Sequence, residues 1–138
     1  MNRYEELVAL ALEARESAYA PYSHFKVGAA LLGESGVIYK GCNVENASYP
    51  ATNCAERTAI FSAVAAGEKE FDAIAIVGGS EYAEQLDLCA PCGVCRQVMR
   101  EFCTPEKFEV ILAKNKTDYQ VFTLEELLPM SFGPENLI

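Results

Sequence analysis

The sequence predicts an α/β fold in three α-β-α layers, with a mixed sheet of about five strands between helices. Three observations support this: five short β-prone runs, strand and helix patterns that alternate in the middle of the chain, and an N-terminal segment with helical apolar periodicity. The chain has 138 residues, the usual size of one domain, so we expect a single domain over residues 1–138.

The first third of the chain predicts a helix followed by a hairpin. Asn2 and Glu5 resemble a capping box, and apolar residues keep helical spacing from there until Pro21. Two β-prone runs follow, over residues 25–32 and 37–42. The sequence Gly-Glu-Ser-Gly at residues 33–36 is typical of the turn that joins antiparallel strands.

The middle of the chain predicts a second helix and a buried strand. Residues 54–66 are rich in alanine, with Thr52 or Asn53 as the expected N-cap and Gly67 suited to the left-handed position after the helix. Residues 71–77 are almost continuously apolar, which indicates a strand covered on both faces and ended by the glycine pair at 78–79.

The last third predicts a third helix over residues 92–102 and two short strands, 108–113 and 119–122, around a turn at 115–118. Thr123 and Glu126 have the spacing of a capping box, so a short final helix should begin there and end at Pro129.

Composition disfavours several classes of function. The chain has 11 basic and 20 acidic residues, a net charge of -9, which opposes the phosphate neutralisation that nucleic-acid binding requires. Its apolar runs are short, so we expect no signal peptide, no membrane partner and a cytoplasmic location. Six cysteines without a secretion signal favour metal or redox chemistry over disulfides.

The most informative motif is a split set of three cysteines and one carboxylate. Cys54 and Glu56 lie at the start of the second predicted helix, and Cys92 and Cys95 lie three apart at the start of the third. Side chains in a first helical turn lean toward its N-terminus, so two helix starts can face one ion. Three thiolates with an open fourth position are typical of catalytic zinc, whereas structural zinc normally has four protein ligands.

The charge of such a site needs compensation. Three thiolates around Zn²⁺ leave a charge of -1, and two helix N-termini, each worth about +0.5, together supply about +1 against it. We hypothesise that Arg57 and Arg96 hydrogen-bond the thiolates and draw off further charge. Glu56 would act as a proton carrier, taking a proton from water, passing it to a ring nitrogen and later protonating the departing amine.

Three motifs together carry a family resemblance: Gly-Cys-Asn-Val-Glu-Asn-Ala-Ser-Tyr at 41–49, Cys-Ala-Glu-Arg at 54–57, and Pro-Cys-Gly-Val-Cys-Arg-Gln at 91–97. The chain resembles the small homotetrameric cytidine deaminases with an all-cysteine zinc site. The resemblance implies one catalytic domain over residues 1–138 that converts cytidine and deoxycytidine to uridine and deoxyuridine, with release of ammonia, in pyrimidine salvage.

The same resemblance implies roles for individual residues. One Zn²⁺ per chain would be held by Cys54, Cys92 and Cys95, with Glu56 as the proton shuttle. The substrate, a free pyrimidine nucleoside, would contact residues from four segments. Asn43 and Glu45 would bind the ribose hydroxyls, Phe25 would line the pocket, the Ala55 backbone would contact the base, and Tyr49 and Phe132 would serve a neighbouring subunit's site.

Two other classes of function remain open at this point. A structural zinc module would use Cys89 as a fourth sulfur ligand, but it leaves Glu56 without a role. A thiol oxidoreductase would use the C-x-x-C pair, but it does not need Cys54. Among deaminases, enzymes acting on nucleotides, polynucleotides, aminated pyrimidine antibiotics or guanine are further alternatives. Cys42, Cys89 and Cys103 are interpreted as small apolar residues or spare thiols.

Overall fold

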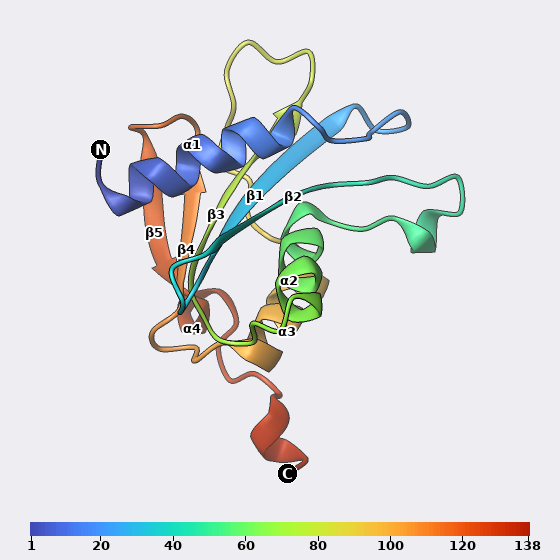
Figure 1. Cartoon of the computed structure of the whole chain (residues 1–138). Coiled ribbons are helices and arrows are strands. Elements are labelled where there is room, and N and C mark those ends of the chain that lie inside the picture. The colour runs from blue at the N-terminus through green and yellow to red at the C-terminus, as the bar shows by residue number, and fades with distance from the viewer.

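The five strands form one mixed sheet at the centre of the molecule (Figure 1). The computed structural model describes residues 1–138. The strand order is β2-β1-β3-β4-β5; β3 and β4 are parallel, and every other neighbouring pair is antiparallel. The predicted mixed sheet is therefore confirmed. The strands are β1 (Phe25–Gly33), β2 (Ile38–Cys42), β3 (Phe71–Ser80), β4 (Glu109–Ala113) and β5 (Tyr119–Thr123).

Helices cover both faces of this sheet, as the three-layer prediction requires. One face carries α1 (Arg3–Arg15), and the other carries α2 (Ala55–Ala65), α3 (Gly93–Phe102) and the short α4 (Leu124–Leu127) (Figure 1). The alternation of side chains along β3 feeds both cores: Ile74 and Ile76 pack on the α2 side, and Ala75 packs on the α1 side. None of the helices combines the length and apolar character needed to cross a bilayer.

Glycine allows β2 to lie very close to α2. A Cβ atom at Gly41 would come within 2.4 Å of the Ala55 carbonyl oxygen and 2.5 Å of the Ala59 nitrogen, both backbone atoms. No side chain fits there, because backbone atoms cannot move aside as a flexible side chain can. This contact fixes the start of α2 against the end of the hairpin.

Most element boundaries agree with the sequence patterns, with two corrections. Asn2 caps α1 through Glu5 N, at 2.9 Å from its side-chain oxygen, but the helix ends at Arg15, well before Pro21. The glycine pair at 78–79 does not end β3, because both residues continue the antiparallel pairing with β1 and the strand runs to Ser80. The Thr123–Glu126 capping box and the left-handed Gly67 are confirmed.

Candidate metal centre and nucleoside site

Two helices begin at cysteines that leave their side chains free for a ligand. Cys54 is the N-cap of α2 and Cys92 is the N-cap of α3, and neither side chain makes a capping hydrogen bond. The predicted N-caps, Thr52 and Asn53, are wrong. The Asn53 backbone instead pairs with Val44, and its side-chain amide donates to Thr58 Oγ1, so it cannot cap the helix.

The three predicted ligand sulfurs come together at these helix starts. The Sγ atoms of Cys54, Cys92 and Cys95 all lie within 4.8 Å of one another, and those of Cys54 and Cys92 are 3.9 Å apart. Tetrahedral zinc with Zn–S bonds of about 2.3 Å requires S–S separations of about 3.8 Å. The donor set therefore fits zinc without rearrangement of the backbone. Cys95 is buried, Cys54 is half-buried and Cys92 is exposed, so the cluster has one open side.

The two arginines have different partners. Arg57 donates to Cys54 Sγ at 3.0 Å, as hypothesised, and its buried Nε has no hydrogen-bond partner. The Cys95 thiol and the Arg57 guanidinium together lower the pKa of Cys54 to about 5. Arg96 does not bond a thiolate, which corrects the hypothesis for that residue. Its guanidinium donates to the carbonyl oxygens of Pro91, at 2.8 Å, and Leu127, at 2.6 Å.

Glu56 is a buried carboxyl group beside the sulfur cluster. Its exposed fraction is 4%, and it lies in the first turn of α2, two residues after Cys54. Burial raises the pKa of Glu56 to about 7, and the negative charge of Cys54 acts in the same direction. A buried carboxyl group next to a cluster of metal-binding type is able to exchange protons with a bound molecule.

The other three cysteines lie outside the cluster. Cys89 packs against Gly78, where a Cβ atom would come within 2.8 Å of its sulfur, and burial raises its pKa to about 11. Burial also raises the pKa values of Cys42 and Cys103. The raised pKa values keep these thiols protonated at neutral pH, and Cys103 packs in the buried core as a small apolar group. A four-sulfur site completed by Cys89 is not formed.

Two of the predicted nucleoside residues are joined through strand β1. Asn43, which is 9% exposed, donates from Nδ2 to the Phe25 carbonyl oxygen at 2.8 Å and accepts at Oδ1 from Val27 N at 2.9 Å. Phe25 begins β1, and its ring is partly exposed. Ala55, in contrast, is fully buried in the first turn of α2.

Glu45 lies next to the loop that precedes β1. Its Oε1 accepts from the backbone nitrogens of Tyr22 and Ser23, at 3.0 and 3.1 Å, and its Oε2 accepts from the Ser23 hydroxyl. Tyr49 begins the 3-10 helix Tyr49–Ala51 and is 74% exposed, with its ring edge-on to Tyr22. Sequence reasoning missed Ser23, although Pro-Tyr-Ser-His is a polar turn sequence in which a serine hydroxyl can bond the backbone two residues on.

Phe132 lies apart from these residues. The C-terminal segment projects from the end of the molecule opposite the loop before β1 (Figure 1), and Phe132 is 59% exposed. Two side chains of α3 hold this segment: Gln97 donates to the Phe132 carbonyl oxygen at 2.9 Å, and Arg100 donates to Ser131 Oγ at 2.8 Å and to Glu135. Sequence reasoning also missed Gln97 and Arg100, whose spacing of three places them on one helix face.

Comparison with known proteins agrees with this geometry. Residues 1–111 match the family model of the cytidine and deoxycytidylate deaminase zinc-binding region. The cytidine deaminase of Sporosarcina psychrophila is 50% identical over 133 residues, covering 96% of this chain and 93% of that protein. This chain belongs to the cytidine deaminase family. The cytidine deaminase of Halalkalibacterium halodurans is 47% identical over 131 residues, with 95% of each chain covered.

Solved structures of cytidine deaminases have the same fold. The cytidine deaminase of Burkholderia pseudomallei has a TM-score of 0.84 and 51% identity, covering 96% of this chain and 100% of that one. That of Mycobacterium tuberculosis has a TM-score of 0.80 and 36% identity, covering 96% and 99%. Cytidine deaminases are hydrolases that act on C–N bonds, so this chain is an enzyme. A purely structural zinc module and a thiol oxidoreductase are no longer needed to explain the cysteines.

Proposed function

We propose that this enzyme hydrolyses cytidine and deoxycytidine to uridine and deoxyuridine, with release of ammonia, in pyrimidine salvage. The observation that carries the proposal is the pairing of three convergent thiols with one buried carboxyl group that is not part of their cluster. A metal site built for catalysis needs an open position and a nearby acid-base group. A site built only for structure needs neither.

Cys54, Cys92 and Cys95 would hold one Zn²⁺ per chain, which would supply Lewis-acid activation of the attacking water. Glu56 takes a proton from that water and delivers it to the ring nitrogen beside the reacting carbon. The same carboxyl group then takes the second proton of that water, from the hydroxyl group now on the reacting carbon, and delivers it to the amine as the C–N bond breaks. Arg57 stabilises the Cys54 thiolate through its 3.0 Å hydrogen bond, which supports a charge-tuning role for this arginine.

The nucleoside would be bound by residues that surround the two helix starts. Asn43 and Glu45 bind ribose hydroxyls, Phe25 lines the pocket, and the Ala55 backbone contacts the base. Tyr49 and Phe132 are exposed in the single chain, which supports their role in the site of a neighbour within a homotetramer. Residues 1–138 act as one catalytic domain, and three reduced thiolates favour a reducing compartment such as the cytoplasm.

The proposed activity is tested directly with purified protein and cytidine. We expect the ultraviolet absorbance of cytidine to change to that of uridine, with release of an equal amount of ammonia. Prolonged treatment with a zinc chelator should abolish the change, and added Zn²⁺ should restore it. Full activity in protein shown by metal analysis to be free of zinc would contradict the metal requirement.

Cytidine 5′-monophosphate serves as the discriminating substrate in the same assay. Its phosphate would approach a protein of net charge -9, with the Glu45 carboxylate near the ribose. Like-charge repulsion should make kcat/KM for the nucleotide about 10²-fold lower than for cytidine. Equal kcat/KM values would favour a nucleotide deaminase instead.

Phe132→Ala should raise KM for cytidine about ten-fold, equivalent to ~1.4 kcal/mol, with little change in zinc content, because an aromatic contact to the base would be lost. Leu137→Ala is the matched control, since it also removes an exposed apolar side chain from the C-terminal segment.

Truncation after Pro129 should reduce activity further than Phe132→Ala does. Light scattering and activity over a dilution series complete the test: a fully active monomer would refute a shared site.

A further inference from the structure

The turn before β1 is built around one serine hydroxyl. Ser23 Oγ accepts a hydrogen bond from Phe25 N at 3.0 Å and donates to Glu45 Oε2. His24, between them, has a φ of 58°, in the left-handed region that few residues other than glycine adopt. That backbone conformation reverses the chain so that the Ser23 hydroxyl and the Phe25 amide can meet. Ser23 therefore links the Glu45 carboxylate to the first residue of β1.

The number of acceptor sites on the Glu45 carboxylate shows how many remain for a ligand. A carboxylate offers about four acceptor sites, two on each oxygen. The Tyr22 and Ser23 nitrogens occupy both sites on Oε1, and the Ser23 hydroxyl occupies one on Oε2. One acceptor site remains, on the oxygen that Ser23 holds. The hydroxyl of Ser23 also keeps the pKa of Glu45 below its ordinary value, so the carboxylate stays an acceptor at neutral pH.

The backbone of Phe25 is held on both sides, by Ser23 at its nitrogen and by Asn43 at its carbonyl oxygen. Its backbone nitrogen is bound to Ser23, which is bound to Glu45, and its carbonyl oxygen accepts from Asn43. The backbone of Phe25 and the side chains of Ser23, Glu45 and Asn43 thus form one hydrogen-bonded unit. Removal of the Ser23 hydroxyl would free the Oε2 side of Glu45 to rotate and would release one end of Phe25.

We propose that Ser23 is a positioning residue for ribose selection: it orients Glu45 so that a single acceptor site faces one nucleoside hydroxyl. The proposal rests on the proposed function, because Glu45 is assigned to the ribose there. Since cytidine and deoxycytidine are both proposed substrates, this hydroxyl is one that the two nucleosides share. Ser23 would therefore set how strongly kcat/KM depends on the presence of that hydroxyl.

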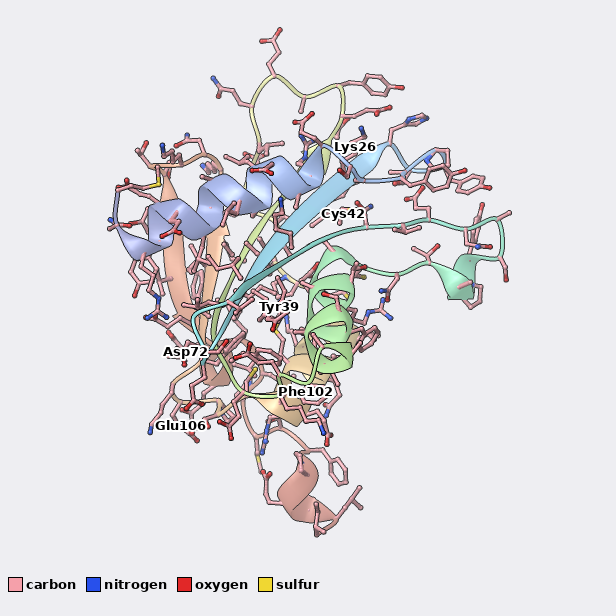
Figure 2. All side chains as sticks on the ribbon, viewed as in Figure 1. Lys26, Tyr39, Cys42, Asp72, Phe102 and Glu106 are labelled. Atoms are coloured by element: carbon pink, nitrogen blue, oxygen red, sulfur yellow. The ribbon has the colours of Figure 1, made fainter.

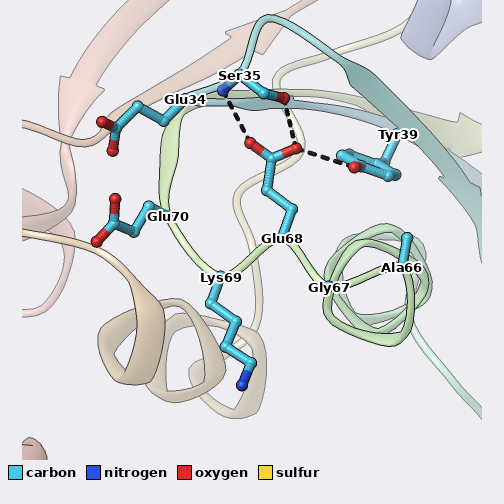
Figure 3. Close-up of a pocket in the computed structure, with 8 residues that line it drawn as sticks. All are labelled: Glu34, Ser35, Tyr39, Ala66, Gly67, Glu68, Lys69 and Glu70. Carbon is cyan, nitrogen blue, oxygen red and sulfur yellow. Dashed lines mark hydrogen bonds between the residues drawn. The ribbon is translucent and has the colours of Figure 1, made fainter.

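The molecule contains a second copy of this arrangement, which provides a matched control. Ser35 N and Ser35 Oγ donate to Glu68 at 2.8 and 2.7 Å (Figure 3), and Ser35 Oγ also accepts from Val37 N at 3.3 Å. Ser35 follows the end of β1, whereas Ser23 precedes its start, so nine strand residues, about 30 Å at ~3.3 Å each, separate them. Figure 2 labels Lys26, near Ser23, and Tyr39, which donates to Glu68 and lies farther along the hairpin, opposite Leu31.

The experiment compares kcat/KM for cytidine and its 2′-, 3′- and 5′-deoxy analogues in wild type, Ser23→Ala, Ser23→Thr and Ser35→Ala. The wild-type enzyme should lose about 10- to 100-fold on the analogue that lacks the hydroxyl bound by Glu45, the range for a hydrogen bond to a charged group. Ser23→Ala should lower kcat/KM for cytidine about ten-fold and leave that analogue almost unchanged, so the selectivity collapses. Ser23→Thr should restore most of it, and Ser35→Ala should behave as wild type.

The possible failures are distinguishable. Equal loss on all four nucleosides in Ser23→Ala, with zinc content retained, would mean a general disturbance of the loop and would overturn the role of Ser23. Unchanged selectivity in that variant would overturn it as well. A wild-type protein that formed no uridine from cytidine would overturn the proposed function, and the role of Ser23 with it.

Discussion

Glu56→Gln should lower kcat for cytidine by at least ~10²- to 10⁴-fold, the range that general acid-base catalysis contributes. The amide has nearly the same shape as the carboxyl group but cannot take a proton from water and deliver it to the base. Because Glu56 lies outside the three-sulfur cluster, zinc content and melting temperature should stay close to those of the wild type. Steady-state kinetics, metal analysis and thermal unfolding measure the three quantities.

Glu101→Gln is the control for this experiment, since it removes the same charge from an exposed position on α3. It should leave kcat unchanged. Near-normal turnover in a Glu56→Gln protein that keeps its metal would remove Glu56 from the mechanism. Loss of metal in the same variant would instead mean that the carboxylate is a ligand.

Each of three single replacements by alanine, at Cys54, Cys92 and Cys95, should weaken zinc binding by more than about 100-fold and abolish activity. Loss of a hydrogen-bond partner of a ligand typically costs 10- to 100-fold in metal affinity, and loss of the ligand itself should cost more. Metal content of the purified variants and competition with a coloured chelator give the affinities.

Cys89→Ala is the matched control, because it removes a thiol that lies three residues before Cys92 but outside the cluster. It should keep about one zinc per chain and normal kcat, with a small loss of stability from the contact with Gly78. The assignment of ligands would be wrong if Cys89→Ala lost the metal while one of the other three cysteines could be replaced without effect.

The sequence predicted the sheet well because hydrophobic periodicity is a strong signal for buried strands. The same signal did not predict where β3 ends. A glycine pair usually interrupts a strand, but here Gly78 and Gly79 stay paired with β1, and Gly78 leaves room for the Cys89 side chain. Local propensity cannot reveal a tertiary contact of this kind. The predicted N-cap of α2 was wrong for a similar reason, since Cys54, one of the three clustered cysteines, takes a position that local preferences give to asparagine or threonine.

The candidate site was predictable where spacing alone brings residues together, as for the three cysteines and Glu56. The two arginines show that spacing predicts short-range contacts but not long-range ones. Arg57 is one helical turn from Cys54 and contacts it, whereas Arg96 reaches away to Leu127, a partner 31 residues distant in sequence. Contacts of that range depend on the tertiary fold. The link from Ser23 to Glu45 spans 22 residues and was missed for the same reason.

Helix α3 joins two features that lie far apart along the chain. It begins at Cys92, carries Cys95 in its first turn, and holds the C-terminal segment through Gln97 and Arg100. A ligand that orders the start of a ten-residue helix also favours whatever docks along it, and thermodynamic linkage makes the effect reciprocal. In the proposed homotetramer, metal affinity and subunit association should therefore reinforce each other: a neighbour that binds Phe132 should tighten metal binding, and removal of the metal should promote dissociation of the assembly.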